Sequence, residues 1–285
     1  YVAASAGLRI TDWLSIGGGA QVLGALIGGF DFDVNLFEKR FESRGLRADL
    51  ETRVAPLAGL TLDFKGLGLR VSAGYRGPIG MDYDLPTNFI FTDLGAVEVR
   101  MSGMAHYSPH TFTAGAQYEF DRATVTAELR YARWSLAPDP SVKVTFNVDG
   151  EALDSLGLGD ALDIEGSSGS PGFVDTLAVH LGGEYWIVEK RLAVRSGYSF
   201  RPTPVPLQNG GTNILDGDTH ALSLGADIAF DDPLEIFQKP IHIEGGYQRL
   251  IVSERVAQKE SDAEVPAYKY RGDVNALVVG VRYAF

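Results

Sequence analysis

The sequence has no cysteine, no run of 18 apolar residues, and fewer basic than acidic side chains, 25 Lys and Arg against 37 Asp and Glu. Without a long apolar run, a transmembrane helix is excluded. The lack of cysteine fits an envelope compartment, where free thiols are a liability. The formal charge of −12 argues against a nucleic-acid partner, because binding nucleic acid needs a basic face.

Catalytic motifs are missing as well. The sequence contains no P-loop, and its five histidines are scattered without His-Glu-x-x-His spacing. His180 and His242 both fall at inward positions of predicted strands, but no nucleophile motif accompanies them. We therefore predict no enzymatic activity, no cofactor and no metal site.

What the sequence does contain is an alternation of apolar and polar residues with a period of two. In the segment 272–285, the odd positions are apolar from Leu277 to Phe285, whereas the even positions Ala276, Gly280, Arg282 and Ala284 are small or charged. This pattern is typical of a β-strand with one apolar face. Because an unpaired edge strand would be sticky, it favours a closed barrel whose apolar face contacts lipid.

The same alternation recurs along the chain and predicts about 11 strands in a single β-barrel domain over residues 1–285. In the second half, the connections alternate between short (189–190 and 232–237) and long (207–217 and 259–270). Outer-membrane barrels have short periplasmic turns and long extracellular loops in this order. The predicted fold class is thus all-β, a transmembrane antiparallel β-barrel of the bacterial outer membrane.

Several interruptions of the strands are expected. The acidic, Gly- and Ser-rich segment 149–175 is predicted to be a long extracellular loop, and shorter loops are predicted at 37–46 and near 85–94. Within 95–120 the apolar positions change from odd to even. We place a bulge at Ser108-Pro109, because one extra residue restores the phase and proline cannot donate to the ladder.

Four stretches carry a resemblance to a known family: residues 8–19, 74–79, 128–135, and 197–206 followed by 215–220. Together they resemble the outer-membrane transporters of long-chain fatty acids and aromatic hydrocarbons of the FadL/TodX type. The resemblance implies a barrel of 14 strands and an N-terminal hatch that plugs the lumen. Since the sequence opens inside strand-like residues, we expect the hatch and about three strands upstream of Tyr1.

Charged residues of both signs fall at inward positions on successive predicted strands. They are Arg70, Glu128, Arg130, Glu184, Arg195, Asp227, Glu244 and Arg282. We predict that they form an ion-paired lumen network that braces the wall and prevents an open aqueous pore. Two further arginines near the outer ends of strands, Arg76 and Arg201, are candidates to pair with a substrate carboxylate.

Four apolar residues break the polar pattern expected of a lumen, namely Leu23, Ile27, Leu57 and Trp134. An apolar track suits an alkyl or aromatic substrate, since each buried CH₂ group is worth about 0.8 kcal/mol. The alternative is that these side chains pack against the hatch. Together with Arg76 and Arg201, they form the predicted ligand-binding set.

The favoured function is passive outer-membrane transport of hydrophobic small molecules, either fatty acids or aromatic hydrocarbons. The resemblance implies lateral release from a plugged barrel into the membrane. The alternative is a structural or docking β-barrel, a subunit of an envelope or secretion assembly that contacts a protein partner through its extracellular loops. A general porin is the third possibility. In each case the expected surroundings are outer-membrane lipid and lipopolysaccharide.

Overall fold

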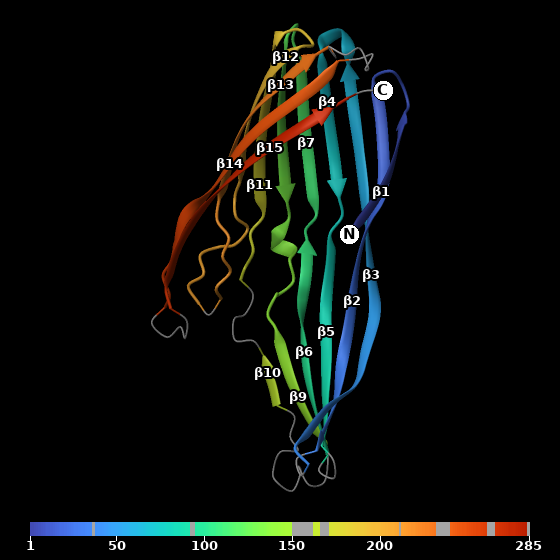
Figure 1. Ribbon diagram of the computed structural model, residues 1–285, viewed down its shortest axis with the longest axis vertical. Coiled ribbons are helices and arrows are strands. Elements are labelled where there is room, and N and C mark those ends of the chain that lie inside the picture. Colours follow the sequence, from blue (N-terminus) through green and yellow to red (C-terminus); the bar gives the residue numbers. More distant parts are fainter. Residues whose placement is uncertain are drawn as a thin grey trace.

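The computed structural model describes residues 1–35, 38–91, 95–149, 162–165, 171–210, 212–231, 240–260 and 266–283. In this part of the chain fifteen β-strands form one sheet, accompanied by two single-turn 3₁₀ helices, η1 (Lys65–Leu67) and η2 (Trp134–Leu136). No helix among the described residues is long and apolar enough to cross a membrane. Figure 1 shows a tall wall of steeply inclined strands.

Eleven of the fifteen strands, all except β5, β6, β9 and β10, make up what we call the wall. In sheet order they are β1 (Val2–Arg9), β2 (Leu14–Asn35), β3 (Arg40–Phe64), β4 (Leu69–Arg76), β7 (Thr111–Glu119), β8 (Ala123–Ala132), β11 (Thr176–Val188), β12 (Leu192–Arg201), β13 (Thr219–Phe230), β14 (Ile241–Ala257) and β15 (Tyr268–Arg282). Every neighbouring pair in the wall is antiparallel. The predicted all-β fold is confirmed, but the described residues form fifteen strands and not about 11, because β5, β6, β9 and β10 were not predicted as separate strands.

The other four strands form a projection beyond the wall, toward the lower end in Figure 1. They are β5 (Ile79–Phe91), β6 (Gly95–Ser108), β9 (Lys143–Asp149) and β10 (Leu162–Glu165), and the outer part of β2 continues the same sheet. About 10 residues suffice for a strand to cross the membrane, so β2 with 22 residues and β3 with 25 extend well past it.

One strand pair departs from the antiparallel prediction. The outer end of β2 pairs with β5 in parallel, for example Phe30 with Thr87. β4 continues through Gly77-Pro78 into β5, and β6 continues through Pro109-His110 into β7. These two bends carry the β5–β6 hairpin from its place between β4 and β7 to the edge of β2. β2 and β5 both run away from the short turns, which is why they pair in parallel.

Two predicted loops are wrong in part. Arg40–Leu46 belong to β3 and residues 85–91 to β5, while 36–37 and 92–94 lie outside the described residues. Arg40, Glu42 and Arg44 made the first of these segments resemble a loop, but within β3 both arginines pair with acidic side chains, Arg40 with Glu42 and Arg44 with Asp33. The predicted bulge within 95–120 is confirmed, but it lies at Ala105 of β6 and not at Ser108-Pro109: Met81 pairs with His106 and Asp82 with Met104, which leaves one residue over. Pro109 lies instead in the bend between β6 and β7.

The acidic segment 149–175 is only partly described. Asp149 ends β9, Leu162–Glu165 form β10 against β9, and residues 171–175 lead into β11. Residues 150–161 and 166–170 lie outside the described residues.

The wall has an apolar outer face and a polar inner face. On β2 the even-numbered Ile16, Val22 and Leu26 are exposed on the outside. On β15, Arg282 reaches inward to Asp227, which is 0% exposed, so the odd-numbered Leu277 and its neighbours of the same parity point outward. This is the orientation predicted from the alternation; Phe285 itself lies outside the described residues.

Candidate functional site

A cavity of about 680 Å³ lies on the concave side of the sheet, where the wall meets the projection. We call it the outer cavity. Its lining includes four of the six predicted ligand-binding residues, namely Leu23, Arg76, Trp134 and Arg201. Because five strands separate β2 from β12 in the sheet, side chains of both can share a cavity only if the wall curls round.

The arginines of the outer cavity differ in their partners. Arg201 places Nη2 at 3.1 Å from Asp216 Oδ1, and it also donates to Thr219. Arg130 places Nη2 at 2.8 Å from Glu128 Oε1. Arg76 Nε, in contrast, is buried and has no hydrogen-bond partner among the described residues. Such a buried, unmet donor costs about 1–3 kcal/mol in general.

His180 shares this property. It lies on β11, lines the same cavity, and its Nε2 is buried without a hydrogen-bond partner in the described part of the chain. The sequence placed His180 inside the barrel but gave it no role. Its strand parity was the signal that could have identified it.

The apolar part of the outer cavity is built mostly from rings. The Trp134 ring centroid lies 6.1 Å from that of Tyr107 and 5.9 Å from that of Phe173. The Tyr107 hydroxyl donates to the Leu136 carbonyl at 3.3 Å, which ties β6 to η2. Burial raises the pKa of Tyr107, so its hydroxyl stays a neutral donor.

A strap, residues 202–218 between β12 and β13, borders the outer cavity through Pro202 and Pro204. Asp216 holds it: its carboxylate accepts from Arg201 and from Thr203 Oγ1 at 2.7 Å, and its carbonyl accepts from Arg255 Nη1 at 2.9 Å. Farther along, Lys259 Nζ donates to three strap carbonyls, those of residues 208, 210 and 212.

The remaining two predicted ligand-binding residues lie apart from the outer cavity. Ile27 lines a separate hollow of about 650 Å³ between β2, β3, β5 and β6, among acidic residues such as Asp49 and Asp82. Leu57 lies on β3, paired with Arg76 of β4, and lines neither hollow. Of the six residues predicted together, four therefore line the outer cavity, Ile27 lines the second hollow, and Leu57 lines neither.

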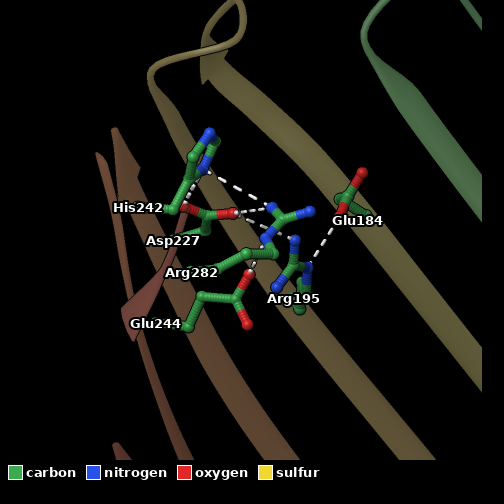
Figure 2. A network of polar contacts seen from close by, with 6 residues as sticks. All are labelled: Glu184, Arg195, Asp227, His242, Glu244 and Arg282. Carbon is green, nitrogen blue, oxygen red and sulfur yellow. Dashed lines mark hydrogen bonds and ion pairs between the residues drawn. The ribbon is translucent and has the colours of Figure 1, made fainter. Parts of the chain in front are cut away.

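Toward the short-turn end of the wall, charged side chains from β11 to β15 meet in one group, which we call the ionic cluster (Figure 2). Arg195 contacts Glu184 (Nε–Oε2, 2.6 Å) and Asp227 (Nη2–Oδ2, 3.3 Å). Arg282 contacts the same Asp227 oxygen at 3.4 Å and Glu244 at 3.2 Å. His242 Nδ1 lies 3.0 Å from the other oxygen of Asp227.

Five of the eight predicted network residues thus belong to the ionic cluster, and the other three form separate pairs. Arg130 and Glu128 pair with each other on β8, and Arg70 of β4 pairs with Asp63 of β3 at 3.2 Å. The sequence analysis missed Asp63 and Asp216 and gave no network role to His242. Asp63 has the inward parity of β3, which was the available signal.

Nearer to the short turns than the outer cavity, several inward positions are small. A hollow of about 420 Å³ is lined by glycines from five strands, Gly7, Gly17, Gly59, Gly74 and Gly115. On β11 and β12, Gly182 pairs with Gly197 at inward positions two residues from Glu184 and Arg195. The inner face therefore carries an amphipathic cavity, a hollow lined by several glycines, and a cluster of ion pairs.

The remaining chemistry of the site is limited. Within the described ranges, no group of three or more His, Asp or Glu side chains is placed to hold a metal ion. The polar groups of the outer cavity are hydrogen-bond donors beside ring faces. Such an arrangement can bind an amphipathic small molecule and orient its polar end.

Comparison with known proteins agrees with this architecture. The family model for outer membrane protein transport proteins (OMPP1/FadL/TodX) matches residues 102–285. No curated protein matches the sequence. Two similar solved structures are a TodX mutant described as a monoaromatic hydrocarbon channel (15% identity, 98% of this chain, 69% of that chain, TM-score 0.53) and the P. putida toluene transporter TodX (14%, 97%, 67%, 0.54). At these identities, the likeness shows the fold.

Proposed function

The chain belongs to the OMPP1/FadL/TodX family of outer membrane transport proteins, and on this premise we propose that it carries hydrophobic small molecules passively across the outer membrane. It has the β-barrel fold of that membrane, with apolar side chains on its outer face. The proposal covers fatty acids and aromatic compounds as candidate cargo. A concentration gradient, maintained by consumption inside the cell, drives the passage.

The observation that carries the proposal is the outer cavity. Leu23 and Trp134 are apolar residues on the inner face, where a purely aqueous pore has no use for them. A greasy molecule gains about 0.8 kcal/mol for each CH₂ group that it buries against such residues. The small inward residues below the cavity, such as Gly59 and Gly74, leave space for the same molecule to descend.

Lateral release into the bilayer is the second part of the proposal. A molecule that continued straight down the lumen would meet the ionic cluster, in which Asp227 is fully buried and shared by Arg195 and Arg282. Opening that cluster for an apolar molecule would leave charges unpaired, at a cost of several kcal/mol. A sideways exit into lipid avoids this cost and returns the molecule to an apolar medium.

The test is uptake by cells with and without the gene. We expect deletion to slow the uptake of labelled hydrophobic compounds, whereas small polar solutes enter as before. Complementation with the Trp134→Ala variant is expected to restore uptake only in part, and the Trp186→Phe variant, whose side chain lies away from the cavity lining, serves as the matched control. Equal uptake of every hydrophobic compound with and without the gene contradicts the proposal.

The projection favours a second candidate function, a docking barrel within an envelope or secretion assembly. Four phenylalanines stack on the projection, with the Phe32 centroid 4.9 Å from Phe41, 5.6 Å from Phe89 and 6.2 Å from Phe30. Phe30 and Phe41 are exposed although they lie outside the membrane-crossing part of β2 and β3. Co-purification of a stoichiometric partner, lost in the Phe41→Ser variant, supports docking; purification without any partner contradicts it.

A further inference from the structure

The outer cavity holds one arginine donor and one imidazole nitrogen that the protein itself leaves unused. Arg76 Nε on β4 and His180 Nε2 on β11 are both buried, both line the cavity, and neither has a hydrogen-bond partner among the described residues. The other predicted lumen arginines all have a carboxylate nearby: Arg70, Arg130, Arg195, Arg201 and Arg282 lie between 2.6 and 3.4 Å from one. In this set Arg76 is the exception.

A buried arginine donor without a partner among the described residues, such as Arg76 Nε, indicates which ligand group would bind there. Buried donors normally have hydrogen-bond partners. A ligand acceptor that binds to a buried donor without a partner removes the free-energy cost of leaving that donor unpaired. The planar guanidinium of arginine matches a carboxylate, to which it donates in parallel. His180 Nε2, which donates when the ring carries its proton there, comes from a different strand of the same cavity and would meet the same polar group. The polar end of the ligand is therefore an oxyanion.

The rest of the lining selects the apolar end. The large apolar groups are flat and rigid: Tyr107 and Trp134, with Phe173 tilted against Trp134, and the rings of Pro109, Pro202 and Pro204. Leu23 is the only leucine that lines the described cavity, and no isoleucine, valine or methionine joins it. Ring faces pack well against another ring in offset or edge-on geometry. A flexible alkyl chain packs less well against such a surface.

We propose that the outer cavity selects small aromatic carboxylates, with the carboxylate held by Arg76 and His180 and the ring packed against Trp134 and Tyr107. This inference rests on the proposed transport function and narrows its substrate class. It separates the cargo of this chain from uncharged hydrocarbons, which leave both donors unmet. It also separates the cargo from alkyl acids, which satisfy the donors but not the ring faces.

The test is binding of three probes to the full-length protein purified in detergent: benzoate, toluene and octanoate, measured by isothermal titration calorimetry. We expect benzoate to bind more tightly than octanoate, which has no ring to pack against Trp134 and Tyr107. Over toluene, its advantage is expected to be at least about tenfold, the size of one charge-assisted hydrogen bond. Arg76→Gln is expected to remove this advantage and to leave toluene binding unchanged. Trp134→Leu is expected to weaken benzoate and toluene alike.

Control variants keep the outcome interpretable. Arg70→Gln removes a guanidinium from the same face of β4, but that residue lies outside the cavity and is paired with Asp63, so it should leave all three affinities unchanged. Arg76→Lys keeps the charge without the planar fork and should restore part of the benzoate affinity. Far-UV circular dichroism and heat-modified gel mobility verify that each variant is folded.

The inference is overturned if benzoate binds no better than toluene or octanoate, or if Arg76→Gln binds benzoate as the unchanged protein does. Uptake measured in the deletion strain separates this from a failure of the proposed function. Uptake of toluene and octanoate without benzoate refutes the aromatic-carboxylate preference and leaves hydrophobic transport standing. Tight benzoate binding without uptake of any probe refutes transport and leaves the site assignment standing.

Discussion

The outer cavity and the ionic cluster both place arginine and histidine side chains on the inner face, but the hydrogen-bond partners of these side chains differ. In the ionic cluster every charge has a partner, and Asp227 alone serves Arg195, Arg282 and His242. In the outer cavity, Arg76 Nε and His180 Nε2 have none among the described residues. The comparison teaches that a lumen charge braces the wall where it is satisfied and marks a binding position where it is not.

The largest effect on stability is expected from a substitution in the ionic cluster, where every charge has a partner. Asp227→Ala leaves Arg195 and Arg282 without their shared buried acceptor, and removing one member of a buried network costs about 3 kcal/mol of unfolding free energy. The partial exposure of both arginines keeps the cost at the low end of the range. Urea unfolding in lipid vesicles, followed by tryptophan fluorescence, measures the loss.

The control for this variant is Asp121→Ala, which changes an exposed aspartate in the short turn between β7 and β8. It should unfold like the unchanged protein, since surface substitutions rarely exceed about 0.5 kcal/mol. If Asp227→Ala matches the control, the ionic cluster does not brace the wall.

An intermediate effect is expected in the hollow lined by several glycines. Gly59→Leu adds a side chain to this hollow, and its Cβ would lie at an ordinary 3.5 Å from the nearest neighbouring atom, the Ala73 carbonyl oxygen. We expect uptake of hydrophobic probes to fall severalfold while binding to the outer cavity is unchanged. Calorimetry on the purified protein and uptake by cells measure the two quantities separately.

Gly66→Leu is the matched control, because it adds the same side chain at the short-turn end, where a Cβ meets nothing within 4 Å. Normal uptake by Gly59→Leu contradicts a route through this space.

The smallest effect is expected at Asp31, whose carboxylate, like that of Asp227, has an arginine partner but is less buried. Asp31 on the projection accepts from Asn88 (2.7 Å) and Arg47 (2.9 Å), and these bonds lower the pKa of its carboxyl below the ordinary value. A lowered folded-state pKa stabilises the β2–β5 contact fully above about pH 4, and the contribution is lost as the pH falls through the lowered pKa. Unlike Asp227, this carboxyl remains partly exposed to solvent.

We therefore expect a modest acid-induced loosening of the projection, seen as faster pepsin cleavage of β5 near pH 2 than near pH 4. Asp31→Asn should remove the difference, because the amide does not titrate. Comparing both proteins at each pH corrects for the activity of pepsin itself. Identical pH profiles for the two proteins contradict the role of Asp31.

Strand parity predicted a large part of the site. It placed Leu23, Arg76, Trp134 and Arg201 on the inner face, and these four residues line one cavity. It also placed Glu184, Arg195, Asp227, Glu244 and Arg282 inside, where they form the ionic cluster. Parity could not separate Ile27 from Leu23, because both are odd-numbered on β2; Ile27 lies farther out, where β5 and β6 cover it.

The sequence by itself determined which face of each strand meets lipid. The alternation of side chains with period two is set within each strand, and it stays the same whichever strand pairs with it in register. Only the tertiary structure decided which strands became neighbours. The bends at Gly77-Pro78 and Pro109-His110 moved the β5–β6 hairpin onto β2, and the curl of the wall brought β2, β4 and β11 to one cavity. Whether a charge such as that of Arg76 finds a partner depends on those long-range pairings, which no single segment encodes.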